Sequence, residues 1–314
     1  MSTPMFPETP RRENGPSFDQ ALAHIQANDF TERDVEALSD LTKQDAATLA
    51  ASWSDLPAEG KVRLVRLMDD LAEAQVNLLF GRALRVALTD ESPVVRQLAV
   101  DALWEDEGPD LCRVLLRVLR EDASTDVRAA AGMGLARYAT AGACEELDDA
   151  LTEELRAALT AVVADQREPY LVRRRALESV AVFGQDPNIR ALISDAYNAD
   201  DAGMQAAALY AMGRSLDQRW VELLVSELRS EDAEMRFEAA RALGEIGDRD
   251  TVPEIANVTT DEDTEVRQAA IMALGRIGGK AAVRVLHALE EDASAADRDA
   301  IADALDEAQD ETLP

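Results

Sequence analysis

The sequence predicts an all-α protein, a right-handed α-solenoid built from stacked antiparallel helix pairs. One motif carries this prediction: Arg or Gln, usually after an apolar residue, recurs seven times with small and apolar residues at fixed offsets behind it. The aligned positions are spaced by 32, 45, 32, 31, 31 and 31 residues, a period typical of stacked helix pairs. They are Arg96, Arg128, Arg173, Gln205, Arg236, Arg267 and Arg298.

Each copy of the motif is predicted to be a helix with a defined beginning and end. Offsets 3, 6, 7 and 10 from the aligned residue carry the small and apolar side chains, which fall on one helix face. Gly184, Gly247 and Gly278 are expected to end helices in a left-handed conformation, and a shorter apolar segment follows, so that each repeat holds two antiparallel helices. Six of seven residues at the expected N-caps can accept a capping hydrogen bond, the set being Ser92, Ser124, Pro169, Asp201, Asp232, Asp263 and Ser294.

Two copies of the motif resemble a known family closely. Residues 232–247 and 263–278 both read D-x-x-apolar-R-x-x-A-x-x-A-L-G-x-I-G, which resembles the short prokaryotic type of HEAT repeat. The resemblance covers roughly residues 90–308 and implies a scaffold whose second helices line a concave surface. Phycobilin lyases, which attach a tetrapyrrole to a phycobiliprotein, contain similar repeats, so the resemblance alone does not determine function.

The repeats suggest a division of the chain into four parts. We expect a disordered Pro-rich tail in residues 1–16, a helical N-terminal cap in 17–88, the repeat array in 89–308 and a short C-terminal tail in 309–314. The cap can include a divergent first repeat marked by Arg63. The single spacing of 45 residues predicts an insertion of about one helix near residues 143–151.

The chain is strongly acidic. Its 62 acidic and 32 basic residues give a net charge of −30, and only three of the basic residues are lysines. Uniform acidity with few lysines favours a halophilic source, whose cytoplasm holds molar salt. The alternative interpretation is that the acidic surface binds a basic partner. Nucleic-acid binding is not expected, because the one dense basic run, residues 173–175, has acidic neighbours and extends into no basic stripe.

No catalytic, metal or cofactor site is predicted. His24 and His287 are the only histidines, and the sequence contains no phosphate-binding loop or nucleophile motif. Cys112 and Cys144 occupy positions where other copies have Ile or Val, so both are expected in the core and not in a disulfide. With no signal peptide or apolar span in the sequence, we expect a cytoplasmic protein.

A candidate binding surface follows from the helical period. Offsets 1, 5 and 9 lie four residues apart and should share a stripe on the concave face. The stripe is rich in Arg, Met and aromatic residues, which anchor protein interfaces. Its arginines could instead pair with carboxylates of neighbouring repeats. The predicted partner-binding residues are Met133, Arg137, Tyr210, Arg214, Phe237, Arg241, Met272 and Arg276.

The aligned arginines are assigned a structural role. Recurring beside an Asp-rich turn, they are expected to form an intramolecular ladder to its carboxylates and carbonyls. Trp104 and Trp220 are expected to be packing residues. The predicted ladder comprises Arg96, Arg128, Arg173, Arg236 and Arg267.

The sequence therefore predicts a non-catalytic scaffold or adaptor for a protein partner. The expected partner segment is acidic or mixed apolar and acidic, because the stripe offers arginines and apolar anchors. Two alternatives remain open: an accessory or lyase-like subunit of an enzyme complex, and a structural subunit of a larger assembly. Neither the partner's identity nor the oligomeric state follows from the sequence.

Overall fold

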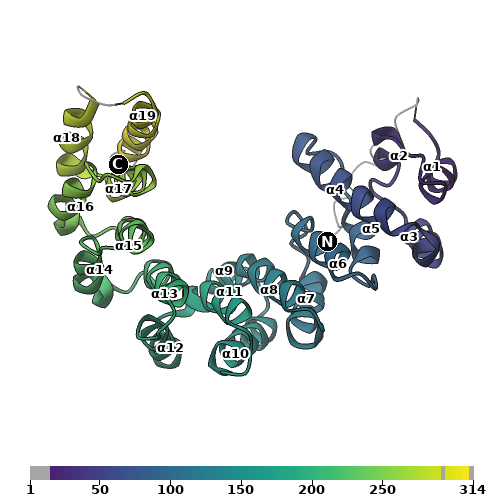
Figure 1. Cartoon of the computed structure of the whole chain (residues 1–314), viewed down its shortest axis with the longest axis horizontal. Helices are drawn as coiled ribbons and strands as arrows, with labels where there is room; N and C mark the ends of the chain where they lie inside the picture. Colours follow the sequence, from purple (N-terminus) through teal and green to yellow (C-terminus); the bar gives the residue numbers. More distant parts are fainter. Residues whose placement is uncertain (1–14, 291–293, 311–314) are drawn as a thin grey trace, which may run out of the picture. The chain divides into compact units, whose positions relative to one another are not determined.

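The computed structural model describes residues 15–290 and 294–310, and throughout these residues it contains helices and turns but no strand (Figure 1). The chain divides into two compact units, Met1–Leu111 and Cys112–Pro314. Most of residues 1–16 and 309–314, for which tails are predicted, lie outside the described residues, although the last helix runs to Asp310. The prediction of an all-α solenoid of antiparallel helix pairs is confirmed.

Unit 1 contains six helices in the part that the structure describes. Helix α4 packs against α2, α5 and α6, while α3 packs against α5. A short 3-10 helix, η1 (Trp53–Asp55), follows α3. The helices are α1 (Phe18–Gln26), α2 (Glu32–Glu36), α3 (Lys43–Ser52), α4 (Ala58–Ala74), α5 (Gly81–Ala87) and α6 (Pro93–Asp101), after which α7 (Pro109–Glu121) crosses the boundary between the units.

Unit 2 is a two-layered stack of helices. The inner row holds the motif-bearing helices, and the outer row holds their antiparallel partners (Figure 1). The inner row consists of α8 (Thr125–Gly134), α11 (Tyr170–Val180), α13 (Ala202–Arg214), α15 (Ala233–Ile246), α17 (Thr264–Ile277) and α19 (Ala295–Asp310). The outer row consists of α10 (Asp149–Ala164), α12 (Pro187–Tyr197), α14 (Val221–Glu227), α16 (Val252–Val258) and α18 (Gly279–Glu290). Short 3-10 helices are η2 (Ala181–Phe183), η3 (Gln218–Trp220) and η4 (Arg249–Thr251).

In the repeat with the 45-residue spacing, the extra length is shared between an added short helix after α8 and a partner helix, α10, that is longer than those of the other repeats. Helix α9 (Ala136–Ala143) follows α8 after a single residue and packs against α10, α11 and η2. A turn at residues 144–148 then leads to α10. The range 143–151, where the spacing predicts an insertion, holds the last residue of α9, this turn and the start of α10.

The inner helices from α13 to α19 approach one another closely because a glycine meets an alanine at each of their three interfaces. A Cβ atom on Gly213 would lie 2.7 Å from Cα of Ala242, and one on Gly244 would lie 2.7 Å from Cα of Ala273. Gly275 and Ala304 repeat this contact at 2.8 Å. The glycine of one motif therefore packs against the alanine of the next, and any side chain there would push the helices apart.

The predicted helix caps are correct in part. The side chains of Asp201, Asp232 and Asp263 accept capping hydrogen bonds as expected. The side chains of Ser92 and Ser124 do not cap, so the prediction is wrong for both. A carboxylate two residues earlier, Asp90 or Asp122, accepts the backbone N–H of the serine instead, at 2.7 and 2.8 Å.

The predicted left-handed glycines are confirmed only at Gly247, which ends α15 with φ of 73° and ψ of 23°. Gly278 ends α17 with a positive φ of 61°, but its ψ of −162° is not that of a left-handed helical residue. Gly184 has φ of −61°, an ordinary right-handed value. Its Cβ would lie 2.3 Å from Cβ of Ser215, so this glycine allows close packing against the next repeat.

The predictions for cysteine and tryptophan are borne out only in part. Cys112 is fully buried, as predicted, and burial raises the pKa of its thiol to about 11. Cys144 is exposed, because it ends the added helix α9 and is not in the outer row. Trp104, expected to be a packing residue, is 45% exposed, and its indole N–H donates to Asp69. Trp220 is half-buried.

A buried charged cluster connects three segments of unit 1. The ammonium of Lys61 lies 2.8 Å from Asp90, and the indole N–H of Trp53 donates to the same carboxylate at 2.8 Å. Burial alone would raise the pKa of Asp90, but the hydrogen bonds from Lys61, Ser92 and Trp53 outweigh it and lower the pKa. Three helical segments, η1, α4 and the start of α6, are therefore held to one carboxylate.

We expect Gly244→Ala to destabilise unit 2 by about 1–3 kcal/mol, because the added methyl meets the backbone of Ala273 and not a movable side chain. Thermal unfolding followed by circular dichroism measures the change. Gly203→Ala on α13 is the matched control, since its Cβ would meet only the ends of the Tyr170 and Arg174 side chains. Equal losses in the two variants would contradict the proposed role of the Gly–Ala contact.

Asp90→Asn should destabilise unit 1 by about 3 kcal/mol, because it leaves the Lys61 ammonium buried without a carboxylate. Urea unfolding monitored by tryptophan fluorescence reports the loss. Combining Asp90→Asn with Lys61→Met removes the unpaired charge and should restore most of the stability. A double variant as unstable as the single one would show that the ion pair is not what matters here.

Candidate functional site

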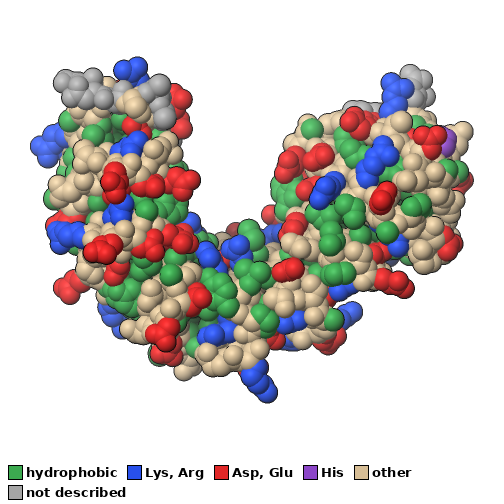
Figure 2. Space-filling view, viewed as in Figure 1, with side chains coloured by type: hydrophobic (Ala, Val, Ile, Leu, Met, Phe, Trp, Pro, Cys, Tyr) green, Lys and Arg blue, Asp and Glu red, His purple; other side chains and the backbone are tan. Residues whose placement is uncertain are grey.

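The eight predicted partner-binding residues, here called the inner stripe, all lie on inner-row helices or on α9, and none is fully buried. Met133 on α8 and Met272 on α17 are 58% and 45% exposed. The other six side chains are half-buried. Figure 2 shows basic side chains gathered on the inner side over α9 and acidic ones along α15 and α17. The stripe is thus an accessible surface of mixed charge.

Arg214 and Arg276 of the inner stripe belong to a ladder of alternating charge at offset 9. Arg214 and Arg276 each lie 3.5 Å from a carboxylate oxygen of Glu245, one repeat away on either side. Arg276 also lies 3.9 Å from Glu307. These four residues, one from each of α13, α15, α17 and α19, are spaced by 31 residues in the sequence. Two arginines predicted to bind a partner are therefore already paired within the protein.

Tyr210 and Arg241 lie together at the middle of the stripe. The Arg241 guanidinium lies 4.3 Å from the centre of the Tyr210 ring, a cation–π contact between α13 and α15. Arg241 also lies 3.5 Å from Glu238, one turn earlier on the same helix. On α9, Arg137 stacks on its neighbour Tyr138 at 5.0 Å. The arginines of the stripe are therefore held against rings or carboxylates.

Small residues on α13 let charged side chains from its two neighbours meet. Gly203, Ala206 and Ala207 occupy the first half of this helix. Arg174 on α11 reaches past them to within 4.0 Å of Glu234 on α15, and also donates to Glu178 at 2.8 Å. Arg175 shares Glu178 at 2.7 Å. The basic run at residues 173–175 is thus largely neutralised by ion pairs.

Glu238 is an unusual carboxyl group beside this crossing. Burial raises its pKa to about 7; the nearby Arg241 and Arg174 lower the pKa, whereas Glu178 and Glu234 raise it further. Its Oε2 atom is buried and accepts no hydrogen bond. Sequence reasoning missed this residue, because offset 2 is a buried alanine in the flanking repeats, Ala207 and Ala269.

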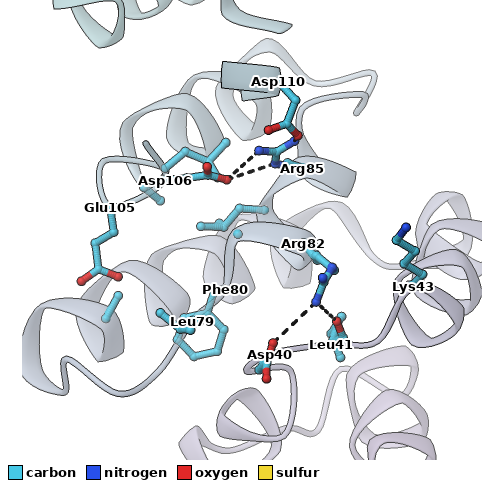
Figure 3. A pocket seen from close by; sticks show the side chains of 15 residues that line it. Asp40, Leu41, Lys43, Leu79, Phe80, Arg82, Arg85, Glu105, Asp106 and Asp110 are labelled. Carbon is cyan, nitrogen blue, oxygen red and sulfur yellow. Dashed lines mark hydrogen bonds and ion pairs between the residues drawn. The ribbon is translucent and has the colours of Figure 1, made fainter. Parts of the chain in front are cut away.

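Unit 1 contains a cavity of about 440 Å³ between α3, α5 and the segment after α6 (Figure 3). Apolar residues from four segments, among them Leu41, Phe80, Leu84 and Leu103, line it. Charged side chains, including three cations, stand around them. The sequence gives no hint of this cavity, because the contributing segments are off-consensus and lie up to about 70 residues apart.

Comparison with known proteins identifies the family. Residues 82–164 and 221–306 match the family model for HEAT repeats. The chain belongs to the HEAT-repeat family. A search of the curated proteins finds no match. The resemblance read from the motif is therefore confirmed at the level of the family.

Two solved structures share the HEAT-like fold. The complex of CpcE and CpcF of phycocyanin lyase from Nostoc sp. PCC7120 is 19% identical, with a TM-score of 0.52 over 92% of this chain and 99% of that chain. Importin beta is 12% identical, with a TM-score of 0.50 over 92% of this chain and 47% of that chain. At these identities the similarity shows the fold alone.

In this HEAT array the aligned arginines bond to the turn before their own helix. Arg96, Arg128, Arg236 and Arg267 each donate through Nη1 to the carbonyl six residues earlier, at 2.8, 2.8, 3.0 and 2.9 Å. Gln205 does the same at 2.9 Å, whereas Arg173 donates to Val163 at 3.1 Å.

Three of these arginines also reach an acidic residue of the next repeat. Arg236 binds Asp261 through two nitrogens at 2.7 and 2.9 Å. Arg128 lies 3.1 Å from Glu168, and Arg267 lies 3.8 Å from Asp297. Four aligned arginines thus fix the turn before their own helix, and three of these four also tie that turn to the neighbouring repeat.

Within the described part of the chain, no group of three or more His, Cys, Asp and Glu side chains is arranged to hold a metal ion. Among the same residues, no helix is both long and apolar enough to cross a lipid bilayer. The geometry described above therefore offers surfaces and a cavity for binding, and the inner stripe is the most extended of them.

Glu238→Gln should stabilise the protein at pH 8 by on the order of 1–3 kcal/mol and have little effect near pH 5. The folded carboxyl has a pKa of about 7 against an ordinary 4.5, so between these values the folded chain binds a proton that the unfolded chain releases. Raising the pH through this window therefore lowers the free energy of unfolding, until the folded pKa is passed.

Thermal unfolding across this pH range measures the effect. Glu231→Gln, an exposed position in the turn before α15, removes the same charge and is the control. A pH-independent difference between Glu238→Gln and the wild type would count against the perturbed carboxyl.

Proposed function

We propose that this HEAT-repeat protein is a non-catalytic scaffold or adaptor that binds a segment of a partner protein along the inner stripe of unit 2. The observation that carries the proposal is the pair of exposed methionines, Met133 and Met272, on an inner face otherwise covered by charged and aromatic side chains. Methionine adapts to different partner side chains and is common at protein-binding surfaces.

The pairing of the arginines determines what kind of segment fits. Arg214, Arg241 and Arg276 already contact Glu or Tyr side chains, so a partner gains little from simply adding a carboxylate. Carboxylates of the partner would replace the glutamates that now pair with these arginines, Glu245 and Glu238. Apolar side chains of the partner would cover the two methionines. We therefore propose a segment in which apolar anchors alternate with acidic residues.

The cellular location of the protein and the salt concentration around it stay predictions. A cytoplasmic location in a salt-loving organism agrees with the net charge of −30 and the scarcity of lysine. At molar salt the screening length falls to about 3 Å, so the apolar anchors supply most of the affinity.

A second candidate is an accessory subunit of an enzyme complex. Its support is the fold shared with the CpcE–CpcF complex of phycocyanin lyase, at 19% identity. Co-expression with a phycobiliprotein and its tetrapyrrole distinguishes the two: covalent chromophore absorbance appears only for a lyase subunit. A structural role in a larger assembly is the third candidate, and the size of the native particle in high salt addresses it.

The combined change Met133→Ser and Met272→Ser should reduce capture of a specific partner from source lysate in molar KCl by at least about fivefold, a loss of roughly 1 kcal/mol. Quantitative mass spectrometry of the co-purifying proteins measures it. Leu216→Ser is the matched control, since Leu216 is 58% exposed like Met133 but lies outside the inner stripe. Equal capture by the methionine variant and the wild type would move the binding surface elsewhere.

A further inference from the structure

The cavity in unit 1 has a size and lining suited to a small ligand. Its volume of about 440 Å³ falls within the usual range of small-molecule sites. The side chains of Leu41, Phe80, Leu84 and Leu103 form an apolar wall. Charged groups stand at its rim (Figure 3), so a ligand would have both apolar and charged parts.

One of the three cations at the rim is already neutralised. The Arg85 guanidinium donates to Asp106 through Nε and Nη2 at 3.1 and 2.8 Å, and Nη1 donates to Asp110. Hydrogen bonds to these two carboxylates outweigh burial and raise the pKa of Arg85. This cluster holds the segment after α6 against α5, and two carboxylates already balance the charge of Arg85.

The other two cations keep donors available. Arg82 donates through Nη1 to the carbonyl of Leu41 at 2.6 Å and lies 3.5 Å from Asp40, while its Nε and Nη2 atoms have no partner among the described residues. The Lys43 ammonium likewise has none in the described part of the chain. Lys43 lies only two residues beyond Leu41, so both cations flank the same edge of the apolar wall.

The helix positions of Arg82 and Lys43 do not explain these two positive charges. Lys43 is the first residue of α3 and Arg82 the second of α5. A helix N-terminus carries partial positive charge, so cations there slightly destabilise their own helices. The Arg82–Asp40 pair is 49% and 72% exposed and contributes little. A ligand that binds to both cations would account for their position.

We propose that this cavity binds a small apolar monocarboxylate. The carboxylate lies between Arg82 and Lys43, and the apolar part packs against Leu41, Leu84, Leu103 and Phe80. Glu105, on the opposite side of the cavity from Lys43 in Figure 3, disfavours a second carboxylate at that end. This site is separate from the inner stripe and does not depend on the scaffold function.

Three probes that share one apolar part test the proposal. Isothermal titration calorimetry with the full chain compares 3-phenylpropanoate, its neutral amide and 3-phenylpropylamine. Charge-assisted hydrogen bonds are stronger than neutral ones, so the carboxylate should bind at least about fivefold more tightly than the amide, and the amine more weakly than either.

Two variants assign the binding to the two cations. Lys43→Gln and Arg82→Gln should each weaken the binding of 3-phenylpropanoate by about fivefold. Neither change should alter the affinity for the amide. Lys280→Gln, an exposed lysine on α18, is the control. Circular dichroism checks folding, and Lys43→Gln stays informative in any case, because the Lys43 side chain makes no hydrogen bond or ion pair to the described residues.

The outcomes separate clearly. Tighter binding of the carboxylate that is lost in both variants supports the site. Equal or tighter binding of the amide or amine, equal effects of Lys43→Gln and Lys280→Gln, or no binding of any probe at millimolar concentration would overturn it.

Discussion

The fold of unit 2 depends on the contact between a glycine of one inner helix and an alanine of the next. Gly213, Gly244 and Gly275 face Ala242, Ala273 and Ala304 at distances that leave no room for a Cβ atom on the glycine. Each contact brings two helix backbones together, and its recurrence gives the three interfaces from α13 to α19 the same close approach. The glycine at the end of the triplet Ala-Leu-Gly (Ala-Met-Gly in α13) is therefore a packing requirement in the three repeats that carry it, at positions 213, 244 and 275.

The same spacing determines what the inner face can do. Once the backbones lie this close, side chains at equal offsets in adjacent repeats come within reach of one another. Arg214, Glu245, Arg276 and Glu307 use this proximity to form an ion-pair ladder along four helices. Its exposed pairs contribute little stability individually. They do, however, give a chain of net charge −30 an inner face on which positive and negative groups are nearly balanced.

The sequence was sufficient to predict what depends on the repeat. The helices, the family, the aspartate caps and the burial of Cys112 all follow from residues that recur in register. The errors at Ser92, Ser124 and Gly184 arose where a neighbouring residue, Asp90, Asp122 or Ser215, determines the local geometry. Cys144 was misplaced because the added helix α9 shifted the register. The alternation of Arg and Glu at positions 214, 245, 276 and 307 was visible in the sequence. The cavity of unit 1 was not, because the segments that line it do not belong to a repeating motif.

A balanced inner face changes where the energy of binding comes from. An approaching segment does not meet free arginines; it meets pairs whose charges it must exchange, and exchange of one surface carboxylate for another is nearly neutral in free energy. Net affinity then comes from covering apolar area, which salt does not screen. The ion pairs still affect specificity, because a segment with misplaced charges would separate existing pairs without replacing them. On this face Met133 and Met272 would thus provide affinity, and the Arg–Glu ladder would select among partners that carry similar apolar anchors.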